Sequence, residues 1–270
     1  MPDALRLAVG TLTAIRVPAP RKVTRIVAGR AMLLAPLVGA VLGLVVSTVP
    51  AVVGLLSPDH RTRASVDLLT SVLSVGLLAL LTRGLHLYGL ADTADGLGVK
   101  GTDTGVRERR LAVMRAPDTG AFGVVAVVFV VVIEVTAISV CIGAGLGTAA
   151  LVVAAATGRL GATWCSTTGV AAARPDGLGA TVAGSVPLGA AWAVSAATLI
   201  GAALLGAVGN AGPGRSISLV GASLLGLGAT SSVLRHCQKR FGGVTGDVLG
   251  AVVEISTAAV LVALALAVTI

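Results

Sequence analysis

Long apolar runs separated by short polar connections make up most of the sequence. A helix that crosses a lipid bilayer needs about 20 mostly apolar residues. Several of these runs have no amphipathic period, which is typical of helices that are buried on all sides. The pattern therefore predicts an all-α, polytopic integral membrane protein with about six or seven transmembrane helices. The seven predicted spans are residues 32–56, 66–87, 121–142, 148–171, 183–208, 217–234 and 247–269.

Composition supports this class and indicates how the helices pack. Of the 270 residues, 55% are hydrophobic and 12% are charged, about half the charged share of an ordinary soluble domain. That share excludes a soluble globular protein and also a disordered chain, which would be polar. Three cysteines in a chain of this length exclude a disulfide scaffold. Because there are 36 glycines but only six aromatic residues (two Trp, one Tyr and three Phe), we expect the helices to pack through small residues.

The placement of Lys and Arg predicts the orientation in the membrane. If the N-terminus is cytoplasmic, 15 of the 20 basic residues lie in cytoplasm-facing connections. The opposite connections hold only Arg61, Arg63 and Arg215. Cytoplasmic loops carry an excess of Lys and Arg, so this orientation in the bacterial inner membrane, the cell membrane, is expected. The cytoplasm-facing connections are residues 1–31, 88–120, 172–182 and 235–246.

No connection is long enough to form a soluble domain, so residues 1–270 are expected to form a single transmembrane domain. Orientation accounts for the net charge of +8, and a nucleic-acid partner is not needed to explain it. The lipid bilayer is the expected partner, and the sequence leaves open a homo-oligomer.

Two aspartates in the segment GLADTADGLG are the first candidates for chemistry. Asp92 and Asp95 are three residues apart and share one face of a helix. Carboxylates on one face repel unless a cation lies between them, and Mg²⁺ usually takes one or two carboxylates together with substrate phosphates. Gly89 and Gly96 beside the pair allow backbone or substrate to approach closely. The alternative is a pair of solvated acids at a helix end.

His86 and Arg115 flank this acidic segment in sequence. A histidine here either packs and hydrogen-bonds or contacts a phosphate as an acid–base group. Arg115, in MRAPDTGAFG, is a candidate for binding phosphate oxygens, together with the free N–H groups of the nearby glycines. For the cluster of Arg107, Arg109 and Arg110, the preferred interpretation is positive-inside charge.

Two further Gly-rich segments lie on the predicted cytoplasmic side. ARPDGLGA contains Arg174, and KRFGGVTGDVLGAVVE contains Asp247, with Glu254 seven residues later on the same helical face. Burying a charged side chain inside a membrane span costs free energy, so such residues are functional candidates. For Glu134 and Arg159, a mutual ion pair is an equally good explanation. Together these segments predict one cytoplasm-facing site for a metal and an anionic substrate.

At GLHLYGLADTADGLG (84–98) the chain resembles the adenosylcobinamide-GDP ribazoletransferase family, the cobalamin synthases. Further likeness follows in order along nearly the whole chain. The segments that carry it are LTAIRVPAP, APLVGAVLG, LAVMR with GAFGV, ARPDGLGATVAGSV and FGGVTGDVLGAVVE.

The resemblance implies the last stage of cobalamin (vitamin B12) assembly, in which a hydroxyl of α-ribazole or its 5'-phosphate attacks the cobinamide phosphate of adenosylcobinamide-GDP. GMP leaves, and Mg²⁺ is the expected cofactor. The preference between the two ribazole forms is left open. The resemblance implies catalytic roles for His86, Asp92, Asp95 and Asp247, metal binding by Asp92 and Asp95, and phosphate or substrate binding by Arg115, Arg174, Gly89 and Gly96.

Two positions depart from the family pattern, which usually has Asp where this chain has Tyr88 and Ala116. Both changes remove a potential metal ligand, since a neutral Tyr hydroxyl is a poor substitute for a carboxylate. They motivate the alternative of a catalytically impaired family member that acts as a binding or assembly partner. A second alternative, a CDP-alcohol-type membrane phosphotransferase, lacks its D-G-x-x-A-R pattern here.

Overall fold

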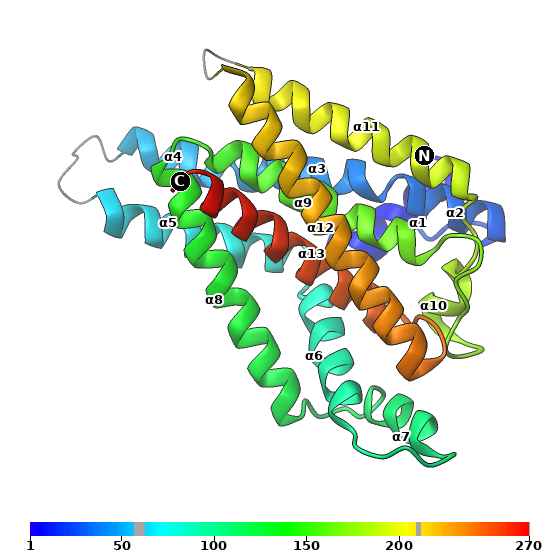
Figure 1. Ribbon diagram of the computed structural model, residues 1–270. Coiled ribbons are helices and arrows are strands. Elements are labelled where there is room, and N and C mark those ends of the chain that lie inside the picture. The colour runs from blue at the N-terminus through cyan, green and yellow to red at the C-terminus, as the bar shows by residue number, and fades with distance from the viewer. Residues whose placement is uncertain (57–62, 209–211, 270) are drawn as a thin grey trace.

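The computed structural model describes residues 1–56, 63–208 and 212–269, which form thirteen α-helices and no β-strand (Figure 1). The prediction of an all-α chain is confirmed. The helices are α1 (Asp3–Leu12), α2 (Arg25–Leu33), α3 (Ala35–Val46), α4 (Thr48–Leu56), α5 (Arg63–Leu81), α6 (Leu85–Gly98), α7 (Val106–Val113), α8 (Ala121–Gly143), α9 (Gly147–Cys165), α10 (Gly177–Val182), α11 (Leu188–Ala207), α12 (Gly212–Phe241) and α13 (Gly246–Ala267).

Six helical stretches in the described chain are long and apolar enough to cross a membrane, which confirms a multi-pass membrane protein. The first combines α2, α3 and α4; the others are α5, α8, α11, α12 and α13. The remaining predicted span, 148–171, corresponds to α9, which ends earlier, at Cys165. Most residues of α9 are buried, including Arg159, and α9 lies in the middle of the bundle (Figure 1).

The predicted span 66–87 is wrong at its C-terminal end. The helix α5 ends at Leu81, and Arg83 and Gly84 adopt left-handed conformations with φ of 55° and 63°. Left-handed residues end a helix, and a non-glycine residue rarely adopts this conformation. The Arg83 guanidinium donates to the carbonyl oxygens of Gly10 and Thr13, each at 3.3 Å. The chain then turns sharply into α6, which carries His86 and the aspartates (Figure 1).

All four predicted connections are partly helical. The 1–31 connection holds α1 and most of α2, the 88–120 connection holds most of α6 and all of α7, and the 172–182 connection holds α10. Residues 235–241, expected in a loop, continue α12 to Phe241. Polar, basic helix ends extend beyond the apolar stretch, so hydropathy alone places the end of such a helix too early.

Close helix crossings occur at small residues, as predicted. A methyl group added at Gly39 would lie 2.3 Å from the carbonyl oxygen of Ala155 on α9, and one at Gly158 would lie 2.8 Å from that of Val253 on α13. Such contacts leave no room for a side chain, so α3, α9 and α13 approach backbone to backbone. Membrane helices commonly associate in this way because small residues maximise van der Waals contact.

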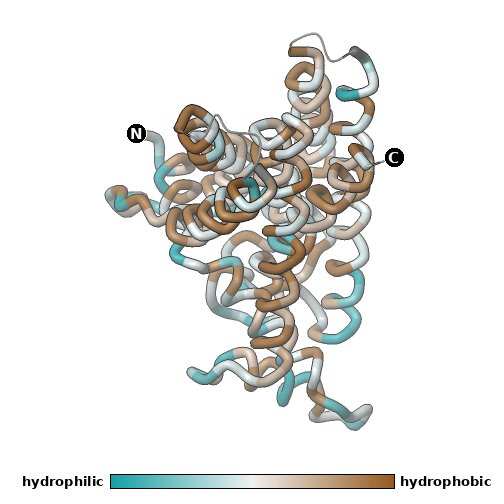
Figure 2. The backbone as a smooth tube through the Cα atoms, turned by 90° about the vertical axis from the view of Figure 1, so that its left-hand side faces the viewer, coloured by the Kyte–Doolittle hydropathy of each residue, from teal (hydrophilic) through white to brown (hydrophobic). Residues whose placement is uncertain are grey.

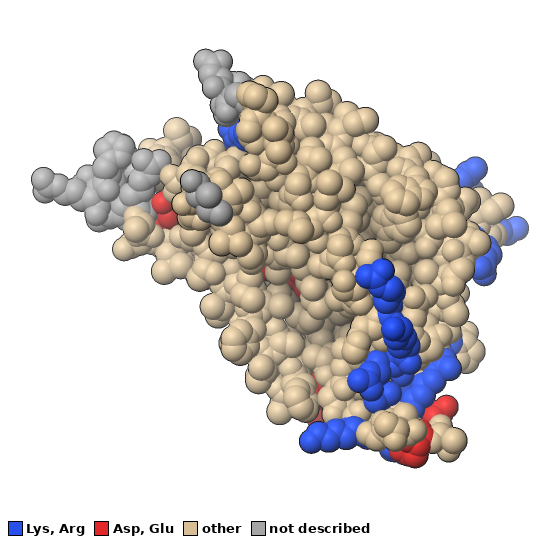
Figure 3. All heavy atoms as spheres, viewed as in Figure 1, with Lys and Arg blue, Asp and Glu red and all other residues tan. Residues whose placement is uncertain are grey.

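Charged residues gather at one end of the molecule. Figure 3 shows Lys and Arg on the right and lower right, near α7, α10 and the end of α12, whereas most of the remaining face is uncharged. Hydrophobic residues follow the helices in Figure 2, and hydrophilic residues are frequent near its lower end. Arg215, assigned to the opposite side, donates to the Gly145 carbonyl oxygen at 3.4 Å. Arg61 lies outside the described residues.

Candidate active site

Helix α6 crosses the start of α13 at two glycines. A methyl group at Gly89 would lie 2.6 Å from the carbonyl oxygen of Asp247, and one at Gly250 would lie 3.1 Å from that of His86. This crossing brings His86, Asp92 and Asp247 to one region. A methyl group at Gly96 would lie 2.7 Å from Met114 Cγ. Gly89 and Gly96 therefore allow close packing, a role that the prediction of substrate binding did not include.

Asp92 lies half-buried on α6 among other charged groups. Burial, followed by the negative charges of Asp247 and Asp95, raises the pKa of its carboxyl to about 6, although the positive charge of Arg174 acts in the opposite direction. Each carboxylate disfavours ionisation of the others. Three acids and one guanidinium from three segments therefore meet, as the sequence predicted.

Asp95 has a different environment, because its carboxylate caps another helix. Oδ2 accepts from the N–H of Gly120 at 2.7 Å, and Oδ1 accepts from the N–H of Gly123 at 2.9 Å. These amides begin α8, where a negative charge is stabilised by unpaired N–H groups and the helix dipole. Methyl groups at Gly120 or Gly123 would each lie 2.5 Å from an Asp95 oxygen. The amides that were expected to bind phosphate thus bind Asp95.

Asp247 sits in the first turn of α13, where a threonine caps the helix. The Thr245 hydroxyl accepts from the N–H of Val248 at 3.2 Å and lies 3.1 Å from Asp247 Oδ2, to which it can donate. Arg174 Nη1 lies 3.6 Å from the same oxygen, and Arg174 Nη2 donates to the Leu111 carbonyl oxygen at 2.9 Å. Arg174 therefore joins the segment before α10 to both α13 and the end of α7.

Backbone hydrogen bonds join the two Gly-rich segments that the sequence singled out. The N–H of Ala173 donates to the Val244 carbonyl oxygen, and the N–H of Val244 donates to that of Ala171, both at 2.9 Å. Arg115, a predicted phosphate ligand, forms an exposed ion pair with Asp176. The side chain of Arg115 is about half exposed, so an anionic ligand has access to it.

His86 is buried on α6 and borders a cavity of about 200 Å³. Asp247, Gly246 and Gly250 line the same cavity, together with residues of α1, α2, α9 and α10. His86 Nδ1 lies 3.5 Å from Arg159 Nη2. His86 and Asp247, which are far apart in sequence but were assigned to one predicted site, thus border one cavity.

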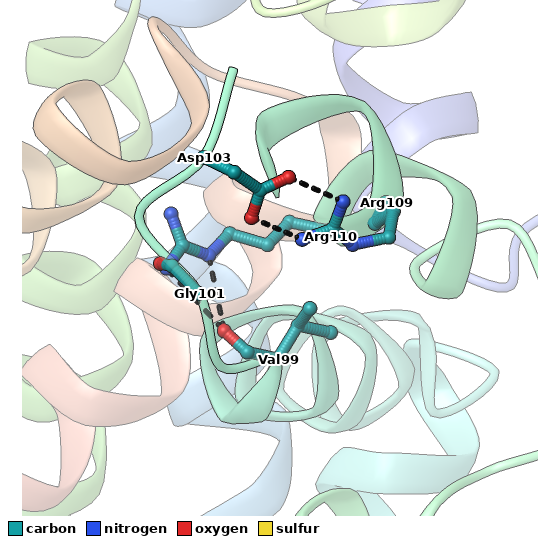
Figure 4. Close-up of polar contacts among 5 residues, drawn as sticks. All are labelled: Val99, Gly101, Asp103, Arg109 and Arg110. Carbon is teal, nitrogen blue, oxygen red and sulfur yellow. Dashed lines mark hydrogen bonds and ion pairs between the residues drawn. The ribbon is translucent and has the colours of Figure 1, made fainter. Parts of the chain in front are cut away.

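The loop between α6 and α7 explains two of the arginines in the 107–110 cluster (Figure 4). Arg109 binds both carboxylate oxygens of Asp103, at 2.8 and 2.7 Å, which lowers the pKa of the Asp103 carboxyl to about 2. Arg110 is buried and donates to the carbonyl oxygens of Val99 and Gly101. These arginines hold the loop together, which adds a structural role to their expected topological one.

The two departures from the family pattern lie at exposed positions. Tyr88 is 64% exposed and borders a separate, apolar cavity between α6 and α8. Ala116 is exposed in the turn after α7 and donates its N–H to the Val113 carbonyl oxygen at 3.0 Å.

Sequence reasoning missed the supporting residues Thr245, Gly120 and Gly123. Thr245 precedes a helix with an acid in its first turn, a pattern of N-terminal capping that was available in the sequence. The partner of Gly120 and Gly123 lies 25 to 28 residues away in sequence, so no local pattern identifies it.

The charges of Glu134 and Arg159 act on each other, but no direct ion pair joins the two side chains among the described residues. In the described chain Arg159 donates to Ala155 and contacts His86, while Glu134 Oε1 and Arg159 Nε are buried without a hydrogen-bond partner. Glu254 and Glu134 act on Arg159 as nearby negative charges.

The donor set agrees with a metal that substrate helps to bind. In residues 1–56, 63–208 and 212–269, no group of three or more His, Cys, Asp and Glu side chains could hold a metal by itself. Mg²⁺ rarely needs such a cage, since it keeps waters and takes one or two carboxylates with substrate phosphates. Asp92 and Asp247 supply carboxylates at this place. Each Asp95 oxygen already accepts one hydrogen bond, so each keeps a second lone pair for a metal ion.

Comparison with known proteins identifies the family. The model of the cobalamin-5-phosphate synthase family matches residues 4–265. This chain belongs to that family. A Frankia casuarinae protein named adenosylcobinamide-GDP ribazoletransferase is 43% identical over 97% of this chain and 94% of its own length. A protein of the same name from a Nocardioides species is 41% identical over 97% of this chain and 98% of its own length. One from Corynebacterium efficiens is 35% identical over 90% of this chain and 84% of its own length.

No solved structure matches the chain. The comparisons with the cobalamin-5-phosphate synthase family confirm the predicted relationship over nearly the whole length, and they give no support to a CDP-alcohol phosphotransferase or to a binding partner without activity.

Proposed function

We propose that this chain is an adenosylcobinamide-GDP ribazoletransferase. A ribose hydroxyl of α-ribazole or its 5'-phosphate attacks the phosphorus attached to cobinamide. A new P–O bond forms, the pyrophosphate P–O bond to GMP breaks, and the hydroxyl proton is released to a group at the site. The products are a phosphodiester and GMP. Family membership and the names of the relatives support this reaction.

The observation that carries the proposal is the meeting of Asp92, Asp247 and Arg174 at the basic end of the bundle. Acidic groups that raise the pKa of one another, beside arginines, suit a site for a divalent cation and a phosphate. The cavity bordered by His86 and Asp247 adjoins this cluster.

The residues have distinct proposed roles. Asp92 and Asp95 would hold Mg²⁺, and Asp92 is the more available of the two because Asp95 also caps α8. The chemistry that Mg²⁺ supplies in such sites is neutralisation of phosphate charge and stabilisation of the leaving oxygen. Arg115 and Arg174 bind phosphate oxygens through their guanidinium groups. Asp247, at the start of α13, would orient the metal or the attacking hydroxyl.

The test is release of GMP by the protein in lipid vesicles with Mg²⁺, adenosylcobinamide-GDP and α-ribazole. We expect corrinoid-dependent GMP release, reduced about 10²-fold or more in Asp92→Asn because the metal loses a charged ligand. Asp103→Asn is the matched control, since Asp103 is exposed and forms its ion pair with Arg109 in the α6–α7 loop. Normal turnover of Asp92→Asn would disprove the metal role of this residue.

The same assay addresses the impaired-enzyme alternative. If the wild-type chain releases no GMP but Tyr88→Asp with Ala116→Asp does, the chain is a degenerate member and the proposed activity is wrong.

The proposed location is the bacterial cell membrane, with the site facing the cytoplasm. The clustering of basic side chains at the end that carries the site supports this orientation (Figure 3).

A further inference from the structure

The contact between His86 and Arg159 favours one placement of the proton on the imidazole ring. His86 Nδ1 lies 3.5 Å from Arg159 Nη2. A guanidinium group has five N–H donors and no acceptor, so the imidazole nitrogen that faces it must accept. A neutral imidazole whose Nδ1 accepts carries its hydrogen on Nε2.

Arg159 is held firmly enough to impose this choice. Arg159 is 1% exposed, and its Nη1 donates to the Ala155 carbonyl oxygen at 3.4 Å. A methyl group at Gly39 would lie 2.8 Å from Arg159 Cδ, so the close approach of α3 encloses the side chain. The guanidinium keeps its charge in a protein, and the nearby negative charges of Glu254 and Glu134 oppose the cost of burying it. A second positive charge on His86 would therefore face Arg159 within a buried site.

The remaining ring nitrogen is available to a ligand. His86 borders the cavity of about 200 Å³ that Asp247 and Gly250 also line. Within the described part of the chain, the ring hydrogen-bonds no side chain other than Arg159. An N–H donor at such a place suits an oxygen acceptor, and the proposed substrates supply phosphate oxygens.

We propose that His86 is a hydrogen-bond donor through Nε2–H to a phosphate oxygen of the substrate, and that Arg159 is the positioning residue that sets this tautomer. The inference rests on the proposed function. It excludes His86 as the general base, because Nε2 already carries a proton and Nδ1 is occupied by Arg159. The proton of the attacking hydroxyl then passes to another group.

Paired substitutions at His86 separate a donor from a base. The amide nitrogen of Gln reaches about as far as Nε2 and can donate, whereas Asn reaches only as far as Nδ1, and Ala has no donor. We expect GMP release by His86→Gln to stay within about tenfold of wild type. His86→Asn and His86→Ala should lose about 10²-fold, the cost of removing one donor to a developing charge. The pH–rate profile of His86→Gln should match that of wild type.

The opposite result would overturn the proposal: His86→Gln as inactive as His86→Ala, with an acidic limb of the wild-type pH profile that His86→Gln lacks. Absence of GMP release by wild type would instead count against the proposed function.

A spectroscopic readout tests the tautomer without turnover. Solid-state NMR of ¹⁵N-histidine-labelled protein in lipid, with His86→Gln used to assign the resonance, should show Nδ1 unprotonated and Nε2 protonated at pH 7. In Arg159→Met, which removes the donors but keeps an unbranched stem, we expect the Nδ1-protonated form to appear. A wild-type Nδ1–H signal would disprove the inference, whatever the activity.

Discussion

Asp92 and Asp95 belong to one short motif on α6, yet their carboxyl groups have different surroundings. Asp95 accepts two backbone hydrogen bonds from the start of α8. Asp92 faces other acids and Arg174, and its pKa is raised to about 6. A carboxylate satisfied by amides stabilises the fold, whereas one crowded by like charges has a reason to bind a cation.

Asp95→Ala should therefore destabilise the protein more than an exposed acid does. The substitution leaves the Gly120 and Gly123 amides without their acceptor, at a cost of about 1–3 kcal/mol in the free energy of unfolding. The check is the apparent melting temperature in detergent, with Asp103→Ala as the control at an exposed ion pair. Equal melting temperatures for the two variants would contradict the capping role.

The raised pKa of Asp92 predicts a pH dependence of Mg²⁺ binding. Because the folded-state pKa lies above the ordinary value of 3.8, protonation of Asp92 stabilises the metal-free fold, and this stabilisation is lost as the pH rises through about 6. Mg²⁺ competes with the proton for the carboxylate. Mg²⁺ should thus raise the apparent melting temperature clearly at pH 7 and much less at pH 5. The difference should disappear in Asp92→Asn; its persistence there would assign the effect to another site.

At the scale of elements, the site depends on how α6 and α13 cross. The sequence predicted that His86 lies at the end of a span, but the structure places it on a separate helix after the left-handed Arg83 and Gly84. That break turns α6 away from α5 and lets Gly89 meet Gly250. The angle between two helices follows from such contacts, which hydropathy does not encode.

Gly89→Ala should disturb this crossing. The added methyl group would lie 2.6 Å from the Asp247 carbonyl oxygen, so α6 and α13 must separate. Overpacking of this kind typically costs about 1–3 kcal/mol, and we expect GMP release to fall as well because His86 moves relative to Asp247. Gly228→Ala on α12 is the matched control, since a methyl group there meets nothing within 4 Å. Similar behaviour of both variants would show that the crossing tolerates separation.

At the scale of the whole molecule, the segments with site residues meet at one end of a helical bundle. The end that carries α7 and α10 is rich in Lys and Arg (Figure 3), and the connection between α8 and α9 lies at the other end (Figure 1). This arrangement agrees with the orientation that basic residues predict.

Cysteine labelling tests the orientation directly. Thr102, in the α6–α7 loop, and Ala144, between α8 and α9, are exposed, and these two connections lie at opposite ends of the molecule (Figure 1). The native Cys141, Cys165 and Cys237 are buried. A membrane-impermeant maleimide should label Ala144→Cys in intact cells and Thr102→Cys only in inverted vesicles. The reverse pattern would overturn the topology and place the site outside the cytoplasm.

Local patterns in the sequence determined the fold class, the approximate positions of the membrane spans, and the segments that form the site, although several span ends were misplaced by five to seven residues. Hydropathy, the positions of small residues and the distribution of charge are local features, so they can be recognised in one sequence without a structure. The family motif likewise lies in contiguous segments.

Only the tertiary structure decided which acid caps a helix, which glycines pack helices, and which nitrogen of His86 faces Arg159. The partners concerned lie far apart in sequence: Asp95 and Gly123, Gly89 and Gly250, His86 and Arg159. Hydrogen bonds and backbone contacts depend on distances of a few ångströms, and these distances arise only when α6, α8, α9 and α13 pack together.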